Sequence, residues 1–555
     1  MTEKISSVED TGFVKILIDF ENRNTDTKTL RKSFSKSKSP IELYRYINYY
    51  LRTEAIRNSS GIESTVDSLS NEGQLRNYKP FWIASLAFAE AKRDGVIVLE
   101  KLPGVEFVGF DLPVTTIKPV MMQGASGFST GVENGLQAIG ATDAWEMGYN
   151  GYGSVVCNID TGVDANHPAL VGSFRGNHGY PAGQCWFDPY TNTTYPVDSR
   201  GHGTHTMGIM VGYAGSDTIG VAPAAQWIAA GAVDRGGDFD RTISDIIASF
   251  QWAADPDDNP ETSDDIPDVI NNSWGIPRGV YPECDDTFWE VIDNCEALGI
   301  VCVFAAGNEG PEPQTLRSPA DRAGSLTSSF AVGAVDGNTS EFPITIFSSR
   351  GPSGCDGVSL KPQVVAPGLS VRSSHLNNSY VYLSGTSMAA PHVSGAAAIL
   401  RQAKPDATVE EIKFALMNSA TDLGENGADY DYGYGIINIP AAIDYLLNPT
   451  GVADEITYND EIPGNIVLHG NHPNPFNAGT EISFELKTSA SINLTIYNLL
   501  GERVKILLNE YLAAGNHEIF WDGSDNHGNP ASSGIYFYRL STPQGNKSKR
   551  MTIIK

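Results

Sequence analysis

Short apolar runs alternate with longer segments of helical spacing through the middle of the chain. The apolar runs lie at residues 154–159, 227–233, 268–270 and 299–305, and the helical spacing is found at 243–254 and 286–298. Continuous apolar strands that alternate with helices predict a parallel sheet with helices on both faces. In such a sheet the functional groups belong at the carboxyl ends of the strands.

The first 125 residues follow another pattern and predict a small α+β domain. The elements expected there are a strand at 13–20, a helix at 41–57, a strand followed by a helix at 81–92, and strands at 95–99 and 105–110. The stretch 124–131 is rich in Gly and Ser. We expect it to be an exposed linker that is open to cleavage.

The last part of the chain consists of short alternating strands separated by Gly, Asn and Asp turns. These strands are expected at 481–486, 491–497, 516–521 and 534–540. Their spacing predicts an antiparallel sandwich. The predicted organisation is therefore an N-terminal domain at 1–125, an α/β domain at 126–448, a linker at 449–464 and a β-sandwich at 465–555.

Length and charge narrow the classes of function. The chain has 555 residues, more than one hydrophobic core of about 250–300 residues accommodates. Its formal charge is −28, and residues 131–459 carry it with 41 acidic against 13 basic side chains, so nucleic acid is not an expected partner. The excess acid predicts a solvated acidic surface or a cation-binding one. No apolar run approaches the roughly 20 residues that span a membrane.

All six cysteines lie in the middle of the chain. Cys157 and Cys302 stand in apolar runs and are expected to be buried free thiols. Cys284, Cys295 and Cys355 flank polar stretches and are candidates for pairing in an oxidising compartment. The first residues lack the features of a signal peptide, so we expect an intracellular protein or one whose leader has been removed.

Three segments place one reactive side chain each at the edge of a predicted element. Asp160 follows the strand that ends at residue 159, and His202 stands between glycines in Gly-His-Gly-Thr-His. Ser387 stands in Gly-Thr-Ser-Met-Ala-Ala-Pro-His, just before an Ala-rich helix whose N-terminus favours a developing anion. Serine, histidine and aspartate together predict an activated nucleophile, its base and the group that orients the base.

Two other kinds of active site are excluded. Asp160-Thr-Gly is also the signature of aspartic proteases, but that chemistry needs two such carboxylates and no second Asp-Thr/Ser-Gly exists. His202 and His205 suggest zinc, yet the His-Glu-x-x-His helix is absent.

The three segments, in the order Asp, His, Ser, resemble the subtilisin-like serine proteases, the subtilases, and most of all their bacillopeptidase F-like branch. The resemblance spans roughly residues 135–447 and ends at Tyr-Gly-Tyr-Gly-Ile-Ile-Asn. It implies that Asp160 orients His202, that His202 is general base and then acid, and that Ser387 attacks the scissile carbonyl. Phe304-Ala-Ala-Gly-Asn-Glu-Gly is similar to the family's oxyanion segment, which makes Asn308 the expected oxyanion donor.

The same resemblance implies where substrate binds. The expected substrate-binding residues are Ser273, Trp274, Gly275, Ala306 and Gly307. Trp274 stands where smaller apolar residues are also common, so a changed specificity is expected. Arg317 aligns near the floor of the primary pocket, and two interpretations stay open: a preference for acidic or polar substrate side chains, or a surface arginine.

Residues outside this region carry two further resemblances. Phe81-Trp-Ile-Ala-Ser-Leu-Ala and Leu102-Pro-Gly-Val-Glu-Phe-Val-Gly resemble the family's inhibitory prodomain, which implies a zymogen cleaved somewhere in residues 115–135. The tail motifs, among them His472-Pro-Asn-Pro-Phe-Asn and Trp521-Asp-Gly, resemble C-terminal sorting domains of type IX-secreted bacterial proteins. A plain Ig-like accessory module is the alternative for the tail.

Together these resemblances imply a subtilisin-like α/β fold with a small prodomain and a C-terminal all-β sandwich. The implied function is that of a secreted or cell-surface serine endopeptidase that acts on polypeptides, and a catalytically inactive binding module of the same fold is the alternative. The implied partners are polypeptide substrates, the chain's own prodomain and the outer-membrane secretion machinery. No cofactor is expected for the chemistry, and the Asp-rich stretch 255–268 is a candidate for structural calcium or a solvated insertion.

Overall fold

The computed structural model describes most of the chain in two compact units, residues 1–450 and 451–555. The described residues are 12–21, 27, 30–31, 38–114, 116–124, 131–191, 193–234, 242–276, 284–448, 466–474, 476–477, 479–486, 489–498, 503–526, 530–532, 534–542 and 545–553. The predicted linker at 449–464 lies outside them, and so does most of the stretch 124–131.

A seven-stranded sheet forms the centre of the first unit, in the order β15-β14-β13-β12-β7-β11-β8. Its strands are β7 (Val155–Asp160), β8 (Trp186–Phe187), β11 (Gln226–Gly231), β12 (Val269–Asn272), β13 (Val301–Ala305), β14 (Phe330–Val335) and β15 (Val364–Pro367). Neighbouring strands are parallel, and nearly all their residues are buried. The predicted parallel sheet is therefore confirmed, because strands covered on both faces read as continuous apolar runs.

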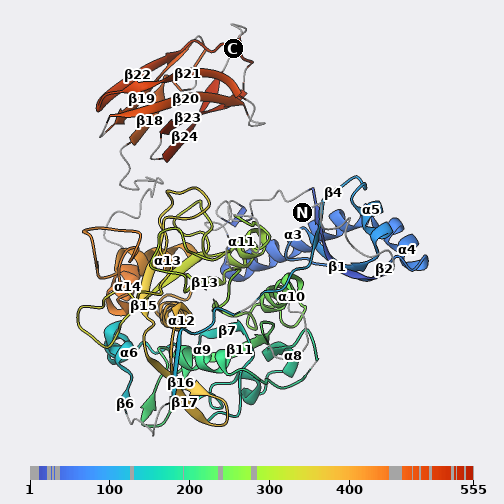
Figure 1. The fold of residues 1–555 in the computed structure, drawn as a ribbon, viewed down its shortest axis with the longest axis vertical. Coiled ribbons are helices and arrows are strands. Elements are labelled where there is room, and N and C mark those ends of the chain that lie inside the picture. The colour runs from blue at the N-terminus through green and yellow to red at the C-terminus, as the bar shows by residue number, and fades with distance from the viewer. Residues whose placement is uncertain are drawn as a thin grey trace. The chain divides into compact units, whose positions relative to one another are not determined.

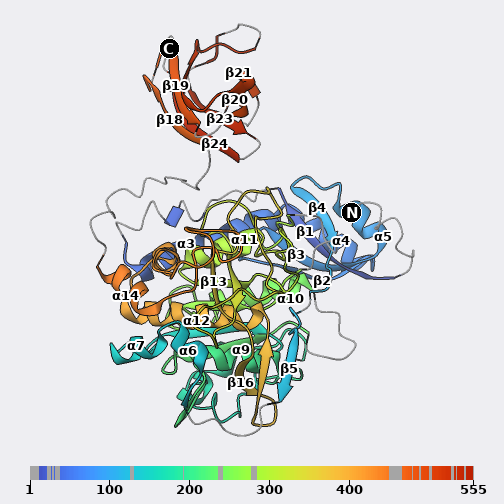
Figure 2. The ribbon, with the colours of Figure 1, turned by 60° about the vertical axis from the view of Figure 1, so that its left-hand side comes forward.

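Helices cover both faces of this sheet (Figure 2). On one face lie α9 (His202–Val211) and α12 (Thr386–Ala403), and on the other lie α10 (Ile243–Ala254) and α11 (Trp289–Leu298). The predicted helices at 243–254 and 286–298 correspond to α10 and α11. The remaining described helices of this region are α6 (Asn134–Ala138), α7 (Ala141–Glu146), α8 (Ala182–Cys185), α13 (Val409–Asn418) and α14 (Ile439–Leu447).

Two small sheets lie beside the central one. The first has the order β6 (Gly131–Val132), β10 (Asp217–Thr218), β9 (Tyr213–Ala214). The second has the order β16 (Val371–His375), β17 (Ser379–Ser384), β5 (Met121–Gly124). The second sheet matters for the site, because β5 is the end of the segment that arrives from the N-terminal part.

The N-terminal part, residues 12–124, begins with a four-stranded antiparallel sheet in the order β2-β3-β1-β4 (Figure 1). Its strands are β1 (Val14–Phe20), β2 (Leu75–Pro80), β3 (Leu86–Ala91) and β4 (Val105–Phe110), and its helices are α3 (Pro40–Ser60), α4 (Glu63–Asn71) and α5 (Arg93–Leu99). Ser39 and Glu42 form a capping box that begins α3.

Two local predictions in this part are wrong. Residues 95–99 form the end of helix α5, in which Val96 and Leu99, three residues apart on one helix face, are buried together with Gly95. The run 81–92 contains no helix; its Ala-rich second half is strand β3, which pairs with both β1 and β2. Pairing on two sides outweighs the helix propensity of alanine there.

The second unit consists of two antiparallel sheets, in the orders β18-β19-β22 and β21-β20-β23-β24. Its strands are β18 (Ile466–His472), β19 (Thr480–Leu486), β20 (Ala490–Asn498), β21 (Arg503–Leu512), β22 (Gly515–Trp521), β23 (Gly534–Thr542) and β24 (Gly545–Ile553). Both sheets contribute side chains to one core that contains Phe484, Leu494 and Trp521. The predicted all-β sandwich is confirmed.

The cysteines divide into one disulfide and four buried free thiols. Cys284 and Cys355 are bonded, while Cys157, Cys185, Cys295 and Cys302 are free. The prediction for Cys157 and Cys302 is confirmed, and that for Cys295 is wrong. Cys295 lies on the buried face of α11, although its sequence neighbours are polar. No described helix has both the length and the apolar composition that a membrane crossing requires.

Candidate active site

Asp160 is the last residue of β7 and is fully buried. The backbone N–H of Thr161 donates to its Oδ1 at 2.7 Å, and the hydroxyl of Thr206 lies 3.4 Å from its Oδ2. These contacts fix the carboxylate at the carboxyl end of a central strand, where the sequence predicts a functional group.

His202 is the first residue of α9, and its Nδ1 lies 2.7 Å from Asp160 Oδ1. The helix comes this close to the strand end because of Gly203: a Cβ there would lie 2.1 Å from the carbonyl oxygen of Gly162. Burial lowers the pKa of His202, but the charge and hydrogen bond of Asp160 outweigh burial and hold that pKa above its ordinary value. The imidazole is therefore oriented and made more basic by its partner.

Ser387 is the second residue of α12 and is fully buried. Its Oγ lies 3.1 Å from the carbonyl oxygen of Ile117 and 3.2 Å from that of Ser273. His202 Nε2 has no hydrogen-bond partner among the residues that the structure describes. The structure therefore joins Asp160 to His202, and the serine hydroxyl is directed to backbone carbonyls instead of the imidazole.

Asn308 follows β13 and is oriented by Thr386. The backbone N–H and the hydroxyl of Thr386 donate to Asn308 Oδ1 at 2.9 Å and 3.0 Å, so Nδ2 points the other way. Nδ2 donates to the carbonyl oxygen of Lys118 at 3.0 Å. A side-chain amide held beside the serine and already bound to a carbonyl is what stabilisation of an oxyanion requires. The sequence reasoning missed Thr386, although it directly precedes Ser387.

Ser273 and Trp274 lie where a substrate strand was expected. The N–H of Ile117 donates to the carbonyl oxygen of Ser273 at 3.4 Å, and Thr116 forms an antiparallel bridge with Trp274. The indole of Trp274 is fully buried and packs on Phe288. The backbone of Trp274 forms the bridge to the bound segment, whereas its side chain is part of the core, so its expected effect on specificity stays a prediction.

Gly275, Ala306 and Gly307 lie beside Arg317. A Cβ at Gly275 would lie 3.0 Å from Cβ of Arg317, and the N–H of Arg317 donates to the carbonyl oxygen of Ala306 at 3.0 Å. A Cβ at Gly307 would meet Arg317 and Glu309. The three expected substrate-binding residues thus line one backbone surface around this arginine.

Arg317 is largely buried and ion-paired. Its Nη2 lies 2.5 Å from Glu309 Oε1, and its Nη1 donates to the carbonyl oxygen of Gly275 at 3.3 Å. Both interpretations of Arg317 stay predictions. The ion pair with Glu309 disfavours a preference for acidic or polar substrate side chains, and the small exposed fraction of the side chain, 13%, disfavours a surface arginine.

His205 does not join His202 in a metal site. Its Nε2 lies 3.1 Å from the carbonyl oxygen of Val381, and burial lowers its pKa to about 3. It is a buried neutral imidazole that links α9 to β17.

The crossing segment, residues 112–114 and 116–124, runs past these groups. In the part of the segment that leads to Ser387, Val114 and Ile117 are buried, with 2% and 0% of their surfaces exposed, and Lys118 is exposed. Downstream, the N–H of Val120 donates to the carbonyl oxygen of Ser384 at 2.8 Å, and β5 continues as an antiparallel partner of β17. The chain therefore lies across Ser387 as an extended peptide.

The N-terminal part also makes a second contact, the helix-face contact, in which α3 and residues 81–85 lie against α10 and α11. Both Glu290 carboxylate oxygens accept hydrogen bonds from Ser85, one from its N–H and one from its hydroxyl, each at 3.0 Å. Asn294 Nδ2 donates to the carbonyl oxygen of Ile83 at 2.7 Å. These contacts depend on particular side chains of α11.

Asp111 adds a carboxylate at the start of α10. The N–H and hydroxyl of Ser244 donate to its two oxygens at 2.9 Å and 2.6 Å. An anion at a helix N-terminus is stabilised by the unpaired N–H groups. Burial nevertheless raises the pKa of Asp111 to about 6, because these hydrogen bonds only partly offset the loss of water.

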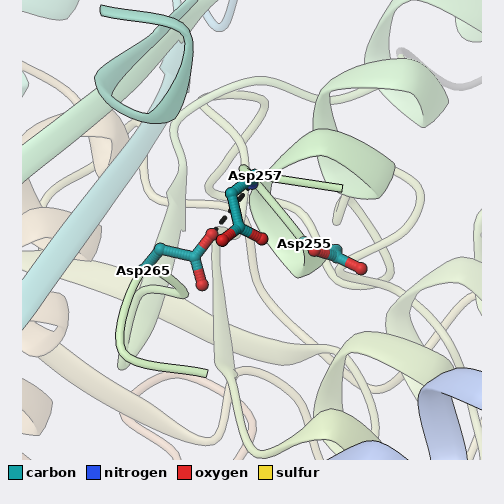
Figure 3. A group of neighbouring side chains, drawn as sticks. All are labelled: Asp255, Asp257 and Asp265. Atoms are coloured by element: carbon teal, nitrogen blue, oxygen red, sulfur yellow. Dashed lines mark hydrogen bonds between the residues drawn. The ribbon is translucent and has the colours of Figure 1, made fainter. Parts of the chain in front are cut away.

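The acidic loop, residues 255–265, follows α10 and corresponds to most of the predicted calcium stretch. Asp255, Asp257 and Asp265 each offer a carboxylate oxygen, and the three oxygens lie within 4.8 Å of one another (Figure 3). Burial and the neighbouring Asp257 raise the pKa of Asp265 to about 6. Oxygen atoms alone are the ligands that Ca²⁺ prefers.

Comparison with known proteins agrees with this geometry. The model of the subtilase family matches residues 151–435, and the model of the FlgD Ig-like domain matches residues 470–546. Subtilisin DY of Bacillus licheniformis is 34% identical over 314 residues, which cover 56% of this chain and 98% of that protein. Subtilisin E of Bacillus subtilis (strain 168) is 30% identical over 399 residues, which cover 72% and 90%. Bacillopeptidase F of the same organism is 31% identical over 459 residues, but the match spans 77% of this chain and only 30% of that protein.

Proposed function

The chain belongs to the subtilase family and is a serine endopeptidase, and we propose that it hydrolyses polypeptides through an acyl-enzyme on Ser387. The observation that carries the proposal is the hydrogen bond from His202 to Asp160 at 2.7 Å, beside a serine that an extended peptide crosses. The alternative of a catalytically inactive module is disfavoured, because the aspartate, histidine, serine and oxyanion donor are all present.

In the proposed reaction His202 Nε2 removes the proton of Ser387 Oγ as the oxygen attacks the scissile carbonyl carbon. Asp160 keeps the imidazole oriented and stabilises its charged form. Asn308 Nδ2 and the N–H of Ser387 stabilise the oxyanion. His202 then gives its proton to the leaving amine, and the same groups activate water to release the acyl group.

A serine-directed sulfonyl fluoride tests the nucleophile. The processed enzyme should gain the mass of one sulfonyl group on the peptide that contains Ser387, and hydrolysis of a peptide substrate should stop in proportion. Modification of another serine with full loss of activity would refute the assignment. The control for reactivity is His202→Ala whose N-terminal part has been removed by added processed enzyme, because an uncovered serine without its base should label far more slowly.

We propose further that the chain is a self-processing zymogen with residues 1–117 as an inhibitory prodomain. Pairing on the upstream side ends at Ile117, whose N–H is bound to Ser273, and pairing on the downstream side begins at Val120. The bond that is cut therefore lies between these residues. Pro119 has no N–H, which disfavours cleavage on either side of it, so we assign the Ile117–Lys118 bond.

In the described arrangement Asn308 binds the carbonyl of Lys118, one residue beyond the proposed bond. Cleavage requires that the carbonyl of Ile117 take this place as Ser387 turns to His202. Ile117→Asp should slow processing by at least tenfold, because a carboxylate would replace a fully buried aliphatic side chain. Lys118→Ala is the matched control and should process normally, since Lys118 is exposed. Normal processing of Ile117→Asp would contradict the assigned bond.

Export is the third part of the proposal: we assign the tail, residues 465–555, the role of a type IX sorting domain. The order of its motifs and the disulfide between Cys284 and Cys355 support an extracellular destination. In a bacterium with this secretion system, the full chain should reach the outer membrane or medium, and a chain that ends at residue 464 should not. Equal export of both would favour an Ig-like accessory module.

A further inference from the structure

The acidic loop has its counter-charges on the N-terminal part. It contains six acidic and no basic residues among eleven. Arg52 of α3 lies 2.7 Å from Asp255 and 2.8 Å from Asp258, and Arg45 of the same helix lies 3.3 Å from Glu261. The guanidinium of Arg52, which belongs to the N-terminal part, thus lies among the carboxylates of the acidic loop.

Among the carboxylates of the loop, that of Asp255 depends most on Arg52 for the stabilisation of its charge. Its side chain is fully buried, and one oxygen accepts hydrogen bonds from Arg52 and from Asn48 of α3 at 3.0 Å. A buried carboxylate without a partner is strongly unfavourable. When the N-terminal part leaves, Asp255 loses both donors on this oxygen, and its charge must be met by water or by another cation.

Asp265 supplies the second observation. It is 4% exposed, and its Oδ1 has no hydrogen-bond partner among the described residues. Its Oδ2 accepts the N–H of Asp257 at 2.9 Å, so the side chain points toward Asp257 (Figure 3). Buried polar atoms are rarely left unpaired, and a bound cation would satisfy an unpaired carboxylate oxygen that lies beside two other carboxylates.

The spacing of the three carboxylates fits one hard divalent cation. Oxygens that lie within 4.8 Å of one another can all be 2.3–2.6 Å from a central Ca²⁺. Such an ion accepts the irregular geometry of a loop and completes its shell with backbone oxygens and water.

We propose that Asp255, Asp257 and Asp265 bind Ca²⁺, and that Arg52 holds the charge of this site until the N-terminal part is released. The inference rests on the proposed function only in that processing frees the N-terminal part. Ca²⁺ and Arg52 compete for Asp255, so Ca²⁺ weakens the helix-face contact and that contact weakens Ca²⁺ binding by the same factor. Calcium is then a signal that favours release of the proposed prodomain.

The test uses the full chain with Ser387→Ala, which cannot process itself, and Ca²⁺ binding is measured by calorimetry in metal-free buffer. Addition of Arg52→Gln should tighten Ca²⁺ binding at least fivefold, because it removes the competing cation. Arg45→Gln is the matched control: it removes a cation from the same helix but leaves Asp255 paired, and it should change little. Equal affinity with and without Arg52 would overturn the proposal.

The ligands are tested in the same Arg52→Gln chain. Asp265→Asn should abolish the added binding, whereas Asp258→Asn, on the exposed side of the loop, should keep it. Tb³⁺ gives a second readout if heats are small, since the ring of Trp82 lies 4.5 Å from the Arg52 guanidinium and can sensitise luminescence. Binding or luminescence that survives Asp265→Asn would refute the site. No proteolysis is involved, so failure here leaves the proposed function intact, and failure to process leaves this result intact.

Discussion

Two of the contacts between the N-terminal part and the rest of the chain, the crossing segment and the helix-face contact, use different chemistry. The crossing segment binds through its backbone: the N–H of Ile117, the carbonyl of Lys118 and strand β5. The helix-face contact consists of hydrogen bonds made by particular side chains, such as those of Glu290 and Asn294. A segment that is bound mainly through its backbone can be exchanged for other extended peptides whose side chains fit the site, whereas a side-chain contact is specific to one partner. The first contact therefore resembles that of a substrate, and we expect the second to determine how long the proposed prodomain stays bound.

The largest expected effect separates cleavage of the chain from binding of the N-terminal part to the rest of the chain, here called docking. Asp160→Asn should lower kcat by about 10⁴, because the amide no longer holds the imidazole in its working tautomer. Self-cleavage should stop, while the helix-face contact stays intact and the chain remains folded. Asp164→Asn is the control, since the one hydrogen bond to its carboxylate among the described residues comes from the N–H of Asn166, and the amide should tolerate it. Comparable losses in both variants would contradict the assignment.

The second effect concerns the oxyanion donor. Asn308→Ala should lower kcat by about 10²–10³, a magnitude established on the matching donor of subtilisin itself, with little change in KM. Self-cleavage should slow by a similar factor. Peptide kinetics and the time course of processing, measured on one preparation, give both numbers. A loss expressed mainly in KM would indicate that Asn308 binds substrate without stabilising the transition state.

The third effect should appear in docking alone. Glu290→Gln weakens the two hydrogen bonds to Ser85 and should shorten the lifetime of the cleaved but bound N-terminal part about tenfold. The measurement is the lag before full activity after processing, and kcat on small peptides should not change. Glu341→Gln, on an exposed loop, is the control. A lag that stays the same would show that Glu290 does not contribute to docking.

The smallest effect is a dependence of docking on pH. Burial raises the pKa of Asp111 to about 6, above the value of about 3.9 of a free aspartate, so the docked state binds a proton more tightly. By linkage, docking strengthens as pH falls from above 6 towards 4, and it weakens as pH rises through about 6. Release of the N-terminal part should thus be faster at pH 7.5 than at pH 5. Asp111→Asn should flatten this dependence, and an unchanged profile would refute the role of Asp111.

The central sheet and the reactive groups could be predicted from sequence because local pattern determines them. Asp160 ends an apolar strand. His202 and Ser387 stand among glycines and other small residues, a composition that indicates close packing of the backbone around them. The side chains of Trp274 and Arg317 could not be placed in this way. The side chain of Trp274 packs in a core to which several elements contribute, and Arg317 forms an ion pair with Glu309. Both contacts depend on how the chain folds and not on neighbouring sequence.

The crossing segment had no readable local signal either. Its contacts at Ile117 and Val120 run through the backbone, and backbone atoms are the same for every sequence. The prediction of a strand at 95–99 is wrong for a related reason: a run of five apolar residues fits a strand and a helical turn equally well. The pairing of Cys284 with Cys355 joins residues 71 positions apart and needs the fold to decide it.

The intact mass of the purified chain over time, measured beside Ser387→Ala, tests the proposed self-processing most directly. The native chain should convert to two products, one that ends at Ile117 and one that begins at Lys118, while Ser387→Ala stays whole. If both chains stay whole, or both are cut alike, Ser387 is not the nucleophile that cuts this bond.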